Sequence, residues 1–191
     1  MKKLLLILLC LPLLFSSCEE GTPTPAVVLA IGDTYQGGII FYLDGDGGGL
    51  IAATSDIGNG AKWGCFETSI SGADEKAIGT GAQNTIDIEA GCTTSGTAAD
   101  ICANYTSEGY SDWFLPSIYE LKEMYLNIGQ GSTLGNIGGF SNVYHWEIVN
   151  HYWSSTENDD DSALYYSFEA GGGIGYWDKY YVRFVRAIRV F

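Results

Sequence analysis

Basic residues are scarce in this sequence. Only 9 lysines and arginines stand against 23 aspartates and glutamates, and the formal net charge is −14 at pH 7. Nucleic acids, anionic lipid surfaces and sulfated glycans are bound by positively charged patches. This composition disfavours all three as partners, and we expect no nucleic-acid partner.

Histidine is also rare, since His145 and His151 are the two histidines of the chain. An enzyme needs a positioned nucleophile, an acid–base pair or a metal. The spacing of the two histidines fits no common zinc motif, and no two carboxylates stand in a recognisable catalytic motif. The sequence therefore favours a protein that is not an enzyme and has no cofactor. An enzyme that uses a metal or carboxylates is the alternative.

Long apolar runs are absent except at the N-terminus. Residues 4–15 form an apolar run that directly follows Lys2 and Lys3. A membrane span needs roughly 20 apolar residues, so this run is too short to be one. A positive start followed by a short apolar run is typical of a signal peptide.

The end of this run is typical of a bacterial lipoprotein. Ser16 and Ser17 are small and precede Cys18, whose thiol can receive a diacylglycerol. We predict that residues 1–17 are a signal peptide and that Cys18 carries the lipid. Simple secretion with a free Cys18 is the alternative. Stable anchoring takes more than one acyl chain, because each buried CH₂ contributes about 0.8 kcal/mol.

Residues 18–25 are expected to be the lipid-bearing cysteine followed by a short linker. The prolines and the glycine of this segment cannot continue a helix or a central strand. Glu19 and Glu20 resemble the acidic signal that sends some lipoproteins to the outer face of the outer membrane. In other bacteria an acidic residue there means retention at the inner membrane. We expect the outer membrane, with residues 26–191 as one domain facing the exterior.

Three cysteines follow the linker, and export makes a disulfide plausible. Cys102 falls on a predicted helix and is expected to be a small buried core residue. Cys65 and Cys92 lie in Gly-rich loop sequence. We therefore predict a Cys65–Cys92 disulfide.

The hydrophobic pattern predicts an α+β protein with helices in the middle and antiparallel strands at both ends. Three helices are expected, at residues 83–89, 97–105 and 118–128. Strands are expected at residues 26–31, 38–43, 49–54, 151–155, 163–168 and 180–191. Asp44 and Gly45 predict a hairpin turn, and Ser117 with Glu120 predicts a capping box.

Three stretches together resemble a known bacterial domain family. They are residues 31–42, residues 109–121, and residues 152–157 together with 181–186. The family is named after the C-terminal domain of a collagen-like adhesin and was formerly of unknown function. It is related to the C-type-lectin-like fold, in the branch of the formylglycine-generating enzyme.

The resemblance implies that the terminal strands pair, that two or three short helices flank the sheet, and that long Gly-rich loops carry the binding surface. The family often has a cysteine at the position of Phe184, and that cysteine would be the natural disulfide partner of Cys102. Because Phe184 replaces it here, Cys102 is expected to be unpaired, which supports the Cys65–Cys92 disulfide. The formylglycine chemistry needs two cysteines late in the chain, and none follows Cys102.

Two arginines and a tryptophan in these motifs are expected to be structural. Arg183 and Arg186 lie in an otherwise apolar stretch and should pair with buried or half-buried carboxylates. Trp113 lies beside Leu115 and should be part of the core rather than a ligand contact.

A segment rich in carboxylates, amides and aromatic rings is the predicted ligand-binding site. Such groups hydrogen-bond to sugar hydroxyls and stack on sugar rings, or anchor a protein partner. The predicted binding residues are Trp153, Glu157, Asn158, Asp159, Tyr165, Trp177 and Asp178. Calcium is conceivable at residues 157–159, although the companion Glu-Pro-Asn motif of calcium-dependent lectins is missing. A solvated turn at residues 158–161 is an equal alternative.

The sequence as a whole predicts a binding or adhesion module of the cell envelope, held to the membrane by a lipid and recognising a glycan or a protein. A structural subunit of a surface fibre or complex is the second hypothesis.

Overall fold

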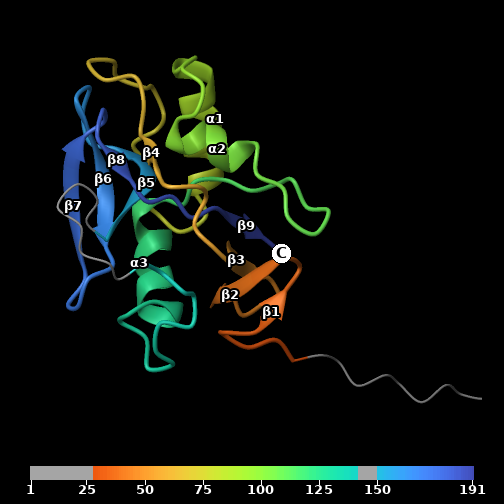
Figure 1. Ribbon diagram of the computed structural model, residues 1–191. Helices are drawn as coiled ribbons and strands as arrows, with labels where there is room; N and C mark the ends of the chain where they lie inside the picture. The colour runs from red at the N-terminus through yellow and green to blue at the C-terminus, as the bar shows by residue number, and fades with distance from the viewer. Residues whose placement is uncertain (1–27, 142–149) are drawn as a thin grey trace, which may run out of the picture.

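The computed structural model describes residues 28–141 and 150–191. It contains helices and antiparallel sheets, so the predicted α+β class is confirmed (Figure 1). The predicted lipoprotein features of residues 1–18 and the linker lie outside the described residues. Within the described residues, no helix has the length and apolar character needed to cross a membrane.

The first sheet joins strands from both ends of the domain in the order β1-β2-β3-β9. Its strands are β1 (Thr34–Tyr35), β2 (Gly38–Leu43), β3 (Gly49–Ala53) and β9 (Ile188–Val190). All neighbours are antiparallel, and β3 pairs directly with β9. The described chain begins beside this sheet, on the opposite side of the molecule from β7 (Figure 1).

The turn between β2 and β3 is held by one aspartate. Asp44 Oδ1 accepts hydrogen bonds from the backbone N–H groups of Asp46 at 2.8 Å and Gly48 at 3.0 Å. The predicted hairpin is confirmed, and the short Asp side chain explains it because it can bond backbone groups a few residues on.

The second sheet has the order β5-β6-β7 and is also antiparallel. Its strands are β5 (His151–Glu157), β6 (Ser162–Ser167) and β7 (Gly173–Asp178). A small third sheet pairs β4 (Ala61–Lys62) with β8 (Val182–Arg183). It lies along β5, because the Trp153 N–H donates to the Phe184 carbonyl and the Phe184 N–H to that of His151.

Three helices pack against these sheets: α1 (Gly81–Gly91), α2 (Ala98–Ala103) and α3 (Ile118–Ile128). α3 has the predicted capping box. The Ser117 hydroxyl accepts from the Glu120 N–H at 3.3 Å, and the Glu120 carboxylate accepts from the Ser117 N–H at 2.6 Å. These bonds satisfy two donors at the start of the helix and fix where it begins.

The core has two parts. In the first, α3 contacts β2, β5 and β6, so it packs against both larger sheets (Figure 1). In the second, α1 and α2 contact β5, and three tryptophans fill the space between the elements. These tryptophans are Trp63, Trp113 and Trp153, all buried, so the core position predicted for Trp113 is confirmed.

Some predicted strands differ from the structure. Residues 28–31 of the first predicted strand form no strand. The long strand predicted over residues 180–191 is broken into β8 and β9. Arg186 lies in the break, and its Nη1 donates to the carbonyls of Ala53 and Gly138. The backbone on either side of it bonds to different segments, since the Val185 and Ala187 carbonyls accept from the N–H groups of Ile57 and Ala53. β1, β4 and β7 were not predicted from the sequence.

One disulfide joins Cys65, in the loop after β4, to Cys92 at the end of α1, and Cys102 is free and buried. The predicted pairing is confirmed. The bond closes a loop with a sequence separation of 27 residues.

Replacing both bonded cysteines, Cys65→Ala with Cys92→Ala, should lower the free energy of unfolding by about 3 kcal/mol, because the unfolded chain regains the freedom of that loop. Urea unfolding followed by circular dichroism measures the loss. The unreplaced chain in reductant is the matched control and should show a similar loss. An unchanged midpoint in both samples would contradict the prediction.

Candidate functional site

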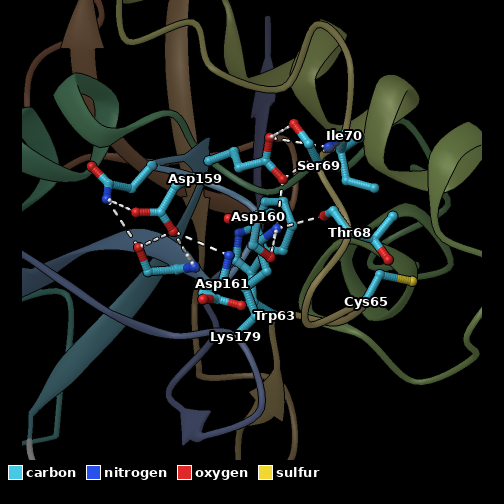
Figure 2. Close-up of polar contacts among 12 residues, drawn as sticks. Trp63, Cys65, Thr68, Ser69, Ile70, Asp159, Asp160, Asp161 and Lys179 are labelled. Atoms are coloured by element: carbon cyan, nitrogen blue, oxygen red, sulfur yellow. Dashed lines mark hydrogen bonds and ion pairs between the residues drawn. The ribbon is translucent and has the colours of Figure 1, made fainter.

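A fully buried lysine lies at the centre of the predicted binding segment. Lys179 Nζ donates to Glu157 Oε1 at 2.6 Å and to the carbonyls of Thr68 and Asp160 at 2.8 Å each (Figure 2). Its ammonium also lies 4.9 Å from the centroid of the Trp63 ring. All three donors of the ammonium therefore have acceptors, which a buried charge requires.

Glu157 is committed to the same network. Both carboxylate oxygens accept from the Ile70 N–H, at 2.9 and 3.0 Å, and Ser69 Oγ donates at 3.3 Å (Figure 2). The side chain is only 6 % exposed. The residue therefore ties the loop at residues 68–70 to β5, and contact of Glu157 with a ligand stays a prediction.

Asn158 and Asp159 form the turn between β5 and β6. Asp159 Oδ1 accepts from the N–H and the hydroxyl of Ser162, both at 2.7 Å. The Ser162 hydroxyl bond is the main reason that the pKa of Asp159 is lowered. Asn158 Nδ2 donates to Asp159 Oδ2 and Ser162 Oγ. The contacts of both side chains favour the solvated-turn alternative.

Calcium does not fit at residues 157–159. The carboxylate of Glu157 already holds the ammonium of Lys179, and a divalent cation there would be repelled by that charge. In the part of the chain that the structure describes, no three His, Cys, Asp or Glu residues gather in a way that could hold a metal ion.

Trp153 is a core residue. It is fully buried, and its indole N–H donates to the Ala61 carbonyl at 3.1 Å. Contact of Trp153 with a ligand likewise stays a prediction. Successive side chains of β5 face opposite sides of its sheet, and Trp153 faces the part of the core that contains α1 and α2.

Four exposed aromatic residues lie next to this network and form one continuous surface, here called the aromatic platform. Successive ring centroids lie 5.0, 4.3 and 5.8 Å apart along the order Phe66, Tyr180, Tyr181 and Trp177. Each residue is between 38 % and 43 % exposed. Of the predicted site residues, Trp177 belongs to the platform, while Phe66, Tyr180 and Tyr181 were missed.

A hollow flanks each end of the platform. The first, of about 340 Å³, lies beside Phe66 and Tyr180 and is also lined by Lys62, Thr94 and Ser95. We call it the Phe66 hollow.

The second, of about 320 Å³, is lined by Tyr176, Trp177, Asp178 and Tyr181. We call it the Trp177 hollow. Trp177 and Asp178, both predicted as binding residues, lie here.

The loop that carries Phe66 has an unusual backbone. Cys65 and Glu67 on either side of Phe66 have positive φ angles of 46° and 62°. Gly64 has a φ of 111°, and a Cβ there would lie 2.5 Å from Thr97 Cγ2, so only glycine fits. The disulfide at Cys65 holds this loop against α1, which fixes Phe66 beside Tyr180.

Arg183 lies beneath the other end of the platform. Its guanidinium carbon is 5.2 Å from the Trp177 ring centroid and 5.6 Å from that of Tyr181. It makes no ion pair with any described residue, so the predicted carboxylate partner is absent. The same prediction for Arg186 is confirmed, because Arg186 Nη2 lies 2.6 Å from Asp56 Oδ1.

Tyr165, the remaining predicted residue, is half-buried and stacks on His151 with ring centroids 4.0 Å apart. Burial, helped by the charge of Arg183, lowers the pKa of His151 to about 4. The imidazole is therefore neutral at pH 7. His145, the other histidine of the chain, lies outside the described residues.

The chain matches no family model and no curated protein. The family resemblance of its three motifs therefore stays a prediction.

Replacing Lys179 with methionine should lower the free energy of unfolding by about 3–5 kcal/mol, because the Glu157 carboxylate would be left buried without its partner. Lys179→Met combined with Glu157→Gln should recover part of this loss. Denaturant unfolding measures both. Lys122→Met, at an exposed position on α3, is the control and should change little. A loss below about 1 kcal/mol for Lys179→Met would contradict the role assigned to the ion pair.

Proposed function

We propose that this protein is a non-enzymatic binding module of the cell envelope, held to the outer membrane by a lipid on Cys18, and that it recognises a glycan on the aromatic platform. The observation that carries the proposal is the platform itself. Contiguous exposed apolar surface is uncommon on a soluble domain and marks sites of interaction. Here it is made of rings in mutual contact, which are suited to stack on the apolar faces of sugars.

The hollows support a glycan over a protein partner. The Phe66 hollow is lined by the polar residues Thr94, Ser95 and Lys62 together with the aromatic residues Phe66 and Tyr180. Ligand sites of this size combine apolar walls with a few polar groups that fix orientation. Each of the two hollows is of a size for a single sugar ring, and the platform lies between them. A flat protein interface does not require two separate hollows of this kind.

We further propose that the fold is C-type-lectin-like. The pairing of β3 with β9, the helices beside the sheets and the long connections that carry Phe66 and Tyr180 agree with that arrangement. In this proposal Lys179 stands where a lectin would use a bound ion, and sugar recognition needs no calcium.

The platform can be tested by binding measurements with the full-length chain purified in detergent. We expect retention on immobilised envelope polysaccharides and on a glycan array. Tyr180→Ala and Trp177→Ala should each weaken binding about tenfold, because each removes one stacking ring.

The matched control is Tyr119→Ala, at an exposed tyrosine on α3 away from the platform, and it should bind as the unchanged chain does. Equal losses in all three variants would contradict the assignment to the platform. Turnover of a polysaccharide would contradict a binding-only role. A stable oligomer that retains no glycan would favour the structural-subunit alternative.

The lipid anchor can be tested by cell fractionation and labelling with radioactive palmitate. The unchanged chain should take up label and follow the membranes, and Cys18→Ser should do neither. Cys10→Ser, within the predicted signal peptide, is the control and should behave as the unchanged chain. Membrane association that persists without label in Cys18→Ser would contradict lipidation at this residue.

A further inference from the structure

Four cationic side chains are almost completely buried: Lys179, Arg183, Arg186 and Arg189. Three of them have a carboxylate partner. Lys179 pairs with Glu157, Arg186 with Asp56 and Arg189 with Asp112. Arg183 is the exception, since none of the described carboxylates lies within ion-pair distance of it.

Arg183 is also short of hydrogen-bond acceptors. Its Nη1 donates to the Val182 carbonyl at 2.8 Å, and its Nε is buried with no partner at all. A buried charge without a partner is unfavourable. The two aromatic rings beside the guanidinium offset only part of that cost.

Arg189 in the same chain shows what the free edge of Arg183 can hold. Arg189 Nε lies 2.7 Å from Asp112 Oδ1, and its Nη2 lies 2.9 Å from Oδ2. This is the two-point bond that a guanidinium makes to a carboxylate. In Arg183 the Nε of the corresponding edge has no acceptor, and its Nη2 donates to no described residue.

The free edge lies behind two rings that line the Trp177 hollow, and Arg183 itself does not line it. The guanidinium lies against the rings of Trp177 and Tyr181, and both rings line that hollow. Arg183 is 4 % exposed, so contact with a ligand requires the exposed ring of Tyr181 to turn aside. Exposed side chains change rotamer within nanoseconds.

We propose that the Trp177 hollow is a subsite for a sugar that carries a carboxylate, a uronic acid or a related sugar acid. Its carboxylate bonds to the guanidinium of Arg183, and its ring stacks on Trp177. This inference rests on the proposed glycan-binding function and adds the chemical class of one sugar in the ligand.

The charge of the protein restricts the ligand further. The formal net charge is −14, and Asp178 lines the same hollow. A dense polyanion would be repelled by this surface. A single carboxylate with uncharged hydroxyls around it meets one buried cation, and Asp178 is placed to accept a hydrogen bond from a sugar hydroxyl.

The subsite can be tested by titrating the full-length chain in detergent with methyl β-D-glucuronide and methyl β-D-glucoside. The two probes differ only at C6, where the glucuronide has a carboxylate and the glucoside a hydroxymethyl group. The glucuronide should bind about tenfold more tightly, as expected for a charge-assisted two-point bond. Arg183→Met should remove this preference, so that the two glycosides bind with equal affinity.

Two further measurements keep the result interpretable. Near-ultraviolet circular dichroism and the thermal midpoint check that Arg183→Met is folded. Arg183→Lys keeps the charge but loses the planar fork, so it should show an intermediate preference. Arg186→Lys, at a buried arginine that is already paired with Asp56, is the matched control and should keep the full preference.

The outcomes separate this inference from the proposed function. Equal affinity for the two glycosides, with binding still lost in Tyr180→Ala, would overturn the acidic subsite and leave the glycan platform standing. Binding of neither glycoside, nor of any polysaccharide, would overturn both. Binding of acetyl-glycyl-glycine as tight as that of the glucuronide would assign the Arg183 site to peptide carboxylates and overturn the sugar assignment.

Discussion

The buried ammonium of Lys179 is the contact on which the surface of this domain depends. Its side chain holds the loop at residue 68, the turn at Asp160 and the end of β5 through Glu157. Its backbone carbonyl accepts from the N–H groups of Trp63 at 3.0 Å and Gly64 at 3.4 Å. One residue therefore fixes the strand before Phe66 and directly precedes Tyr180 and Tyr181. The exposed rings keep their spacing because the charge beneath them cannot move without leaving Glu157 unpaired.

The other buried cations divide into those that stabilise the fold and one that does not. Arg186 joins Asp56 to the carbonyls of Ala53 and Gly138, and so connects β3 with the chain after α3. Arg189 fixes Asp112, whose pKa is lowered mainly by that hydrogen bond. Arg183 has no such task. A charge held in place at the edge of a sheet, with no carboxylate partner among the described residues, is the basis for the ligand contact proposed above.

Much of the fold could be predicted from the sequence because its signals are local. The capped helix α3 and the β2–β3 hairpin each depend on residues within four positions of one another, and both are confirmed. The candidate site depends on contacts between residues 22 to 111 positions apart, such as those of Lys179 with Glu157 and Thr68. No local pattern reports these contacts, so the burial of the predicted binding residues Glu157 and Trp153 could not be foreseen. β7 was missed because Gly173 and Gly175 interrupt its alternation, and Gly175 is required because the Tyr165 ring lies over it.

The described chain begins beside the first sheet, far from β7 (Figure 1). A domain fixed at its N-terminal end therefore presents β7 and the rings around it on its distal side. In the proposed arrangement, attachment at the N-terminal end and recognition on the platform therefore use opposite sides of one domain.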